Sequence, residues 1–163
     1  MTPARPPAPA DAAALLDHVL THFHEAHRRD LPALLALARA LPASPQAQAL
    51  TEHVARFGQA LEAHMFKEEM RLFPMMEQGG HTLIAQLIDD MAREHRQHEA
   101  AVDELRHLRA ALPADAAAAA KGGGGFDTAL ARLLDDLAAH VQAEDEHLFP
   151  RFLAADPPRT AAR

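Results

Sequence analysis

The chain has 163 residues, of which 48% are hydrophobic, enough for one domain with a sizeable core. Its net charge is −7 and it has no basic stripe, which argues against nucleic acid as a partner. It contains no cysteine, so disulfides, thiolate zinc sites and cysteine nucleophiles are excluded. The Pro-rich N-terminus lacks a signal-peptide core and no apolar run could span a bilayer, which favours a cytoplasmic protein without a membrane partner.

Proline and glycine punctuate four long stretches with helical periodicity. In chain order, the expected helices span about 11–41, 45–77, 81–111 and 126–153. Pro32 lies inside the first, where we expect a kink or a local break because proline has no backbone N–H to donate. The Ala- and Gly-rich residues 114–125 are expected to form a flexible linker. One domain, 11–154, is therefore predicted between a disordered N-terminus, 1–10, and a frayed tail, 155–163.

Leucine and alanine dominate the apolar residues, whereas β-branched and aromatic residues are scarce, which favours helix over sheet. Short connections between long helices predict an all-α, antiparallel, up-down-up-down four-helix bundle. The chain also holds twelve histidines, and some lie among core-facing residues. His95 and His98, for example, share a helical stripe with Leu87, Met91 and Val102. Ionisable groups on such a stripe are costly unless they are paired or bind a metal.

An internal repeat connects these histidines with glutamates. The second and fourth expected helices both read H-x3-E-x3-L-F-P, and the first and third both contain H-x2-H. In the second helix the motif consists of His64, Glu68 and Leu72-Phe73-Pro74, and in the fourth helix of His140, Glu144 and Leu148-Phe149-Pro150. The first helix contains His24 and His27, which correspond to His95 and His98 in the third. A spacing of four places His and Glu on one helical face. The pattern indicates two related helix pairs around a pseudo-two-fold axis, with Leu-Phe-Pro as a packing and helix-end signal.

The depth of these histidines in the bundle follows from the helical rise of about 1.5 Å per residue. His64 lies about 22 Å before the turn at Gly79, and His95 lies about 24 Å after it. His24 lies about 30 Å before Ser44, and His64 about 30 Å after it. The fourth helix agrees in the same way. In an antiparallel bundle, the four repeated histidines therefore fall at one height, near the middle.

Imidazoles and carboxylates without thiolates suit iron, manganese or zinc. Two carboxylates from opposite helices can bridge two metal ions, with the four imidazoles binding in pairs. The H-x3-E motif differs from the E-x-x-H of ferritin-like bundles, so a ferritin is not predicted. The competing interpretation is a metal-free helical interaction module with His–Glu ion pairs. His27 and His98 are either hydrogen-bond partners of the ligands or polar groups near the bundle edge.

These motifs resemble the hemerythrin-like, or HHE cation-binding, family over about residues 11–154, and most closely the C-terminal domain of the iron–sulfur cluster repair di-iron proteins. The matching stretches are 24–32, 64–74, 94–95 and 140–151. The resemblance implies two iron ions with an oxo or hydroxo bridge; manganese and zinc are the alternatives that the ligand types allow. The implied ligands are His24, His64, Glu68, His95, His140 and Glu144. In the family pattern the two glutamates bridge the irons, and the imidazoles bind in two pairs, His24 with His140 and His64 with His95.

The sequence departs from the family patterns in three places. The repair proteins usually carry an additional domain with a cysteine pair, whereas this chain has no cysteine. The oxygen-carrying hemerythrins have H-x3-H on the third helix, where this chain has Glu99 after His95. Their fourth helix has H-x4-D, a spacing that Asp145 satisfies from His140. The internal repeat favours the neighbouring Glu144 over Asp145.

We therefore predict a non-haem di-iron protein that acts in the response to nitric oxide, oxygen or oxidative stress, or in the repair of iron centres; the sequence does not decide whether it is an enzyme. Its expected partners are oxygen, nitric oxide or peroxide, and iron–sulfur proteins. The alternative is oxygen or nitric oxide binding or sensing, or iron handling, without turnover.

Overall fold

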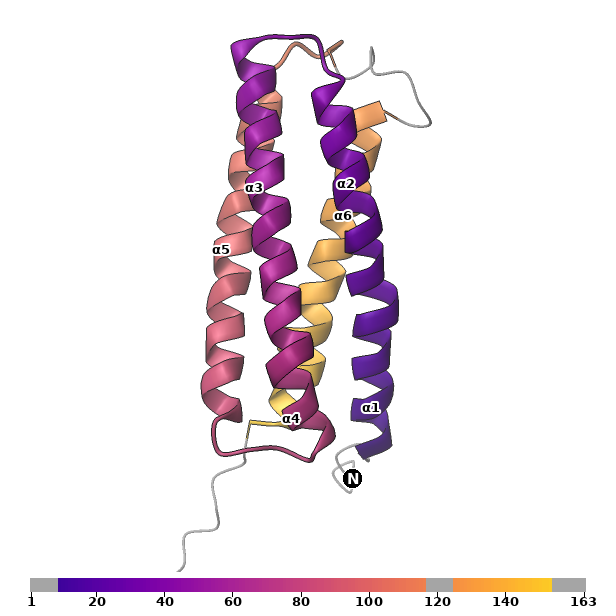
Figure 1. The fold of residues 1–163 in the computed structure, drawn as a ribbon, viewed down its shortest axis with the longest axis vertical. Coiled ribbons are helices and arrows are strands. Elements are labelled where there is room, and N and C mark those ends of the chain that lie inside the picture. The colour runs from indigo at the N-terminus through magenta and orange to yellow at the C-terminus, as the bar shows by residue number, and fades with distance from the viewer. Residues whose placement is uncertain (1–8, 117–124, 154–163) are drawn as a thin grey trace, which may run out of the picture.

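The computed structural model of the protein describes residues 9–116 and 125–153. All regular elements within these ranges are helical, and they form the predicted antiparallel four-helix bundle (Figure 1). Residues 1–8 of the N-terminus predicted to be disordered, most of the predicted linker and the predicted frayed tail lie outside the described residues. Pro9 and Ala10, predicted to be disordered, instead begin the first helix. None of the described helices is long and apolar enough to cross a membrane.

The first long helix consists of three consecutive segments. These are α1, Pro9–His18; a π-helical segment η1, Val19–His24; and α2, Glu25–Arg39. Of the kink or local break expected at Pro32, the break is not present, because α2 continues through this residue to Arg39. Leu31 and Leu34, on either side of the proline, are both buried, so their packing holds the helix together where one backbone hydrogen bond is missing. The change in helix type lies at η1 instead.

The second long helix begins and ends at conventional signals. It comprises α3, Pro45–Lys67; a π-helical segment η2, Glu68–Leu72; and α4, Phe73–Glu77. The hydroxyl of Ser44 accepts a hydrogen bond from the backbone N–H of Ala47 at 3.0 Å and caps α3. The chain then turns at Gly79 and Gly80, whose φ angles of 88° and 113° favour glycine.

The third and fourth long helices complete the bundle. The third is α5, Ile84–Ala110, which is α-helical throughout. The fourth comprises α6, Gly125–Gln142; a π-helical segment η3, Ala143–Leu148; and a short 3-10 turn η4, Phe149–Arg151. In Figure 1, α3 and α5 lie side by side, as do α2 and α6, and in both of these pairs the two helices are in contact.

Two apolar clusters fill the bundle, one toward each end. The upper cluster of Figure 1 takes residues from α2, α3, α5 and α6, with Leu34, Leu50, Leu105 and Phe126 fully buried. The lower cluster lies toward the other end of the bundle and consists of the following residues: Leu16, Val19, Phe23, Leu72, Phe73, Met76, Ile84, Ile88, Met91, Leu148 and Phe149. A buried layer of histidines and glutamates separates the two clusters.

Candidate metal centre

The structure brings the six predicted ligands together in this buried layer. Each has an exposed fraction of 5% or less. They come from all four long helices: His24 from η1, His64 from α3, Glu68 from η2, His95 from α5, His140 from α6 and Glu144 from η3. The depth argument from helical rise predicted a common height for the four histidines, and the structure brings these four together.

The six residues divide into two groups of four that share both glutamates. Within each group, one ligand atom from every residue lies within 4.8 Å of the others. One group holds His24 and His140, the other holds His64 and His95, and Glu68 and Glu144 belong to both. The grouping of imidazoles is the one that the family resemblance implied.

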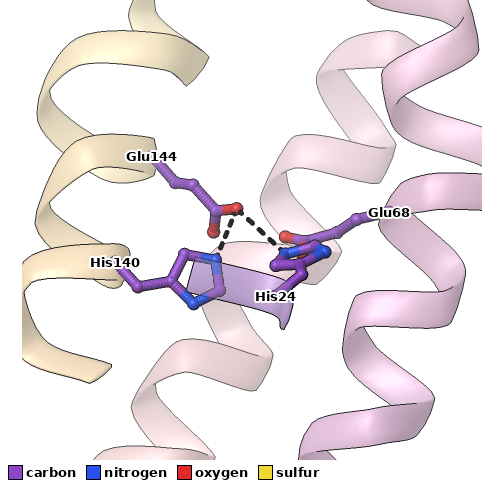
Figure 2. Close-up of side chains that lie close together, drawn as sticks. All are labelled: His24, Glu68, His140 and Glu144. Carbon is purple, nitrogen blue, oxygen red and sulfur yellow. Dashed lines mark hydrogen bonds and ion pairs between the residues drawn. The ribbon is translucent and has the colours of Figure 1, made fainter. Parts of the chain in front are cut away.

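Each glutamate directs its two oxygens toward different histidine pairs. Glu68 Oε2 lies 3.2 Å from His24 Nε2, whereas its Oε1 lies 3.2 Å from His64 Nε2. Glu144 Oε1 lies 2.9 Å from His140 Nε2, and its Oε2 lies 3.1 Å from His95 Nε2. Figure 2 shows one of the two groups, with Glu144 between His140 and His24. This arrangement suits carboxylates that bridge two cations.

The spacing of these donor atoms fits transition-metal ions. Such ions bind nitrogen and oxygen ligands at about 2.1 Å, so neighbouring ligands on one ion lie about 3 Å apart. The Nε2-to-oxygen distances of 2.9–3.2 Å match that separation. Several of the same buried atoms have no hydrogen-bond partner: His24 Nε2, both oxygens of Glu68 and Glu144 Oε2. Buried polar atoms without partners are rare, and a bound cation would satisfy all of them.

The electrostatics of the layer also favour a cation. Burial and the neighbouring Glu144 raise the pKa of Glu68 well above its usual value. Burial acts in the same direction on Glu144, but His140 and His95 outweigh it and hold the pKa of Glu144 well below its usual value. Without metal, a proton on one carboxyl group therefore limits the repulsion between the two. A bound cation would take the place of that proton.

Every candidate histidine turns Nε2 toward the glutamates and uses Nδ1 for a contact on its outer side. The Nδ1 of His24 donates to Glu69 at 2.7 Å. The Nδ1 of His64 donates to Glu94 at 2.9 Å, and the Nδ1 of His95 donates to Asp145 at 2.9 Å. Nδ1 of His140 lies 3.1 Å from His27 Nε2. A proton on Nδ1 leaves the Nε2 lone pair directed at the centre of the layer, which is the tautomer that a metal ligand needs.

The π-helical segments lie at the centre. η1 ends at His24, η2 begins at Glu68, and η3 contains Glu144. A π turn inserts one extra residue per turn and frequently occurs at functional sites. Because of this insertion, Glu68 and the following Leu72 and Phe73 can all be buried. The sequence analysis did not predict these segments.

The Leu-Phe-Pro repeats pack against the centre from the lower cluster. The Phe73 ring stacks on His24 with 5.8 Å between centroids, and the Phe149 ring stacks on His95 with 5.9 Å. Both phenylalanines are 2% exposed. The repeats therefore have the packing role predicted for them, and they also exclude water from one side of the layer.

Two residues left open as alternative ligands lie outside the group. The Asp145 side chain is 38% exposed and contacts Nδ1 of His95 rather than the shared space. Glu99 is exposed on α5. Both residues lie beside a cleft of about 500 Å³ between α5 and the helix formed by α6 and η3. The cleft reaches His95 and His98, and its walls include apolar residues such as Leu137.

The two further histidines of the repeat are both buried, but only one hydrogen-bonds to a ligand. His27 contacts His140 as described, and burial, followed by the proximity of His140 and His24, lowers its pKa to about 3. His98 lies edge-on to His64 with 4.9 Å between ring centroids, and its Nδ1 has no hydrogen-bond partner.

Sequence motifs did not identify Glu69 or Glu94 as partners of the ligands. Each is a direct neighbour of a ligand in the chain, since Glu69 follows Glu68 and Glu94 precedes His95. Such adjacency was the one available signal. It was insufficient, because adjacent helical residues point about 100° apart and many such glutamates face solvent.

A four-helix bundle with a buried layer of imidazoles around two shared carboxylates defines a class of helical cation-binding domains. The chain belongs to the hemerythrin HHE cation-binding domain family, which it matches over residues 15–158. It is also similar to the iron-sulfur cluster repair protein YtfE of Escherichia coli and of Escherichia fergusonii. Each is 30% identical over 156 residues, an alignment that covers 90% of this chain and 69% of the relative.

Proposed function

We propose that this protein holds two iron ions through His24, His64, Glu68, His95, His140 and Glu144, with the two glutamates bridging. One observation carries the proposal: each glutamate directs one oxygen toward each histidine pair, at 2.9–3.2 Å from the nearest Nε2. Iron is preferred over manganese and zinc because the similar proteins are named for the repair of iron–sulfur clusters.

We further propose that the loaded protein acts on iron centres damaged by nitric oxide, oxygen or peroxide, with iron–sulfur proteins as its partners. Iron held by these six residues would supply redox chemistry and coordination positions for a small ligand. The chain's own residues hold the imidazoles in one tautomer through Nδ1 and shield them from water with Phe73 and Phe149. The cleft between α5 and α6 supports access of a small molecule, since it leads directly to His95 and His98.

The exposed position of Glu99 favours this function over oxygen carriage. The oxygen carriers have a further histidine at this place on the third helix, and Glu99 does not face the ligands of this chain. The alternative of reversible oxygen or nitric oxide binding predicts a reduced protein that takes up and releases the gas unchanged.

Anaerobic reconstitution with Fe²⁺, followed by metal analysis and absorption spectroscopy, tests the proposal. We expect two irons per chain and, after exposure to oxygen, irreversible oxidation. Recovery of the reduced spectrum on removing oxygen would favour reversible carriage. A chain that retains no iron would contradict the whole proposal and favour the metal-free interaction module.

A further inference from the structure

The internal repeat makes the two halves of the centre nearly equivalent, so any departure from that equivalence is informative. The repeat pairs His24 with His95, and His64 with His140. His24 and His95 follow it closely. His24 donates from Nδ1 to Glu69 at 2.7 Å, and His95 donates to Asp145 at 2.9 Å. Glu69 and Asp145 occupy the same place in the repeat, directly after Glu68 and Glu144.

His64 and His140 depart from the repeat. His64 donates from Nδ1 to the Glu94 carboxylate at 2.9 Å, whereas the Nδ1 contact of His140 is the His27 imidazole at 3.1 Å. The residue equivalent to Glu94 is Phe23, which precedes His24 as Glu94 precedes His95. The Phe23 ring stacks on His140 with 5.3 Å between centroids, so an apolar ring occupies the place of the carboxylate.

The two groups of ligands consequently differ in how many of their imidazoles have a carboxylate partner at Nδ1. Both imidazoles of the His64–His95 pair donate to carboxylates. In the His24–His140 pair only His24 does so. Its partner Glu69 also accepts hydrogen bonds from Arg28 on both oxygens, at 2.8 and 3.2 Å, so a cation offsets part of its charge. Glu94 has a cationic partner too, Lys67, but only at one oxygen.

A carboxylate that accepts the Nδ1 proton of a ligating histidine raises the basicity of its Nε2 and fixes the ring, and loss of such a partner typically costs about 10- to 100-fold in metal affinity. A neutral imidazole does this less well, because it carries no negative charge. From this difference we infer that the two metal positions are unequal: the position between His64 and His95 retains its ion, and the position between His24 and His140 releases its ion first. The inference rests on the proposed di-metal function.

Metal release from the intact, Fe²⁺-loaded protein tests the inference. An excess of a chromogenic chelator is added anaerobically, and the absorbance of the iron–chelator complex is followed with time. We expect two phases of one iron each in the wild type, separated by at least about tenfold in rate. A single phase of two irons would overturn the inference while leaving the di-iron proposal intact. A wild type with fewer than two irons would contradict the di-iron proposal itself.

A matched pair of variants identifies which position gives which phase. Glu94→Gln and Glu69→Gln make the same change beside different metal positions. Each removes a charge while keeping a hydrogen-bond acceptor for the ligand, His64 or His24. Glu94→Gln should speed the slow phase about tenfold or abolish it, and Glu69→Gln should speed only the fast phase. The reverse assignment would overturn the inference. Asp145→Asn, at a half-exposed site, should also speed the slow phase and provides the test if Glu94→Gln does not fold by circular dichroism.

Discussion

The upper apolar cluster and the histidine–glutamate layer occupy the same four helices, but their residues are stabilised in different ways. Leu50 and Phe126 are fully buried among other apolar side chains, which is favourable in water without any ligand. Glu68 and Glu144 are equally buried, yet three of their four oxygens have no hydrogen-bond partner. Burying such groups costs free energy. The comparison indicates that the apolar clusters stabilise the fold without any ligand, whereas the layer costs free energy that a bound cation would offset.

The largest expected effect comes from removing one shared carboxylate. Glu68→Gln keeps the shape of the side chain but removes its charge, so at least one ion should be lost. Metal at a thousandfold its dissociation constant adds about 4 kcal/mol to the free energy of unfolding, or about 10 °C in Tm. This metal-dependent rise should shrink in the variant, and it should disappear if both ions are lost. The metal-free variant should be no less stable than metal-free wild type, because the pKa of Glu68 is already raised.

Metal analysis and thermal unfolding with and without Fe²⁺ measure these effects. Glu99→Gln is the matched control, since it makes the same chemical change at an exposed position on α5. The control should keep two ions and the full rise in Tm. Two ions retained by Glu68→Gln would show that the carboxylate does not bridge.

A truncation in the upper cluster should lower the stability of the protein without changing its metal binding. Leu50→Ala removes a fully buried side chain and should lower the free energy of unfolding by about 2–5 kcal/mol. The loss should be the same with and without metal, and the number of bound ions should not change. Urea unfolding of both forms provides the measurement. Leu83→Ala, at a side chain that is 52% exposed, should cost less than about 0.5 kcal/mol.

The smallest effect is expected at the surface, where α5 and α6 are joined by an ion pair. Arg109 donates to Asp127 at 2.8 Å, and this hydrogen bond lowers the pKa of Asp127 although partial burial opposes it. The pair therefore stabilises the protein above the unfolded pKa of about 3.9, and this contribution is lost as the pH falls through the lower folded value.

Asp127→Asn should lower the free energy of unfolding by about 0.5 kcal/mol at pH 7, because the Asp127 side chain is half-exposed. The difference from wild type should shrink as the pH falls from about 3.9 through the lower folded pKa of Asp127, since Asp127 then loses its charge and resembles the asparagine. Urea unfolding across this pH range measures the difference. A difference that stayed constant with pH would mean that the carboxylate charge is not its source.

The four helices and the six candidate ligands could be predicted because both depend on local spacing. Helical periodicity identified the buried faces, and the H-x3-E repeat placed His64 with Glu68 and His140 with Glu144. The rise per residue then predicted a common depth. The choice of Glu144 over Asp145 as the inward-facing residue also followed from the repeat, and the structure directs Asp145 to the outer nitrogen of His95.

Features that depend on packing between helices could not be predicted in this way. The π-helical segments accompany the joint burial of Glu68 with Leu72 and Phe73, and of Glu144 with Leu148 and Phe149, and no residue type signals that insertion. Of the kink or local break expected at Pro32, the break is absent, because buried leucines on both sides of the proline hold α2 together. The contact between His64 and Glu94 joins α3 to α5, and its register is set by the whole bundle.

The grouping of the histidines has a topological consequence. In each group one imidazole comes from the first helix pair and one from the second, as with His24 and His140, which are separated by more than a hundred residues. Each ion bound as proposed would therefore be a cross-link that closes a long loop of chain. Disulfides stabilise folded proteins by restricting the unfolded chain in the same manner. In a chain without cysteine, bound metal would restrict the unfolded chain reversibly. A bundle that has lost its iron would therefore also have lost these cross-links.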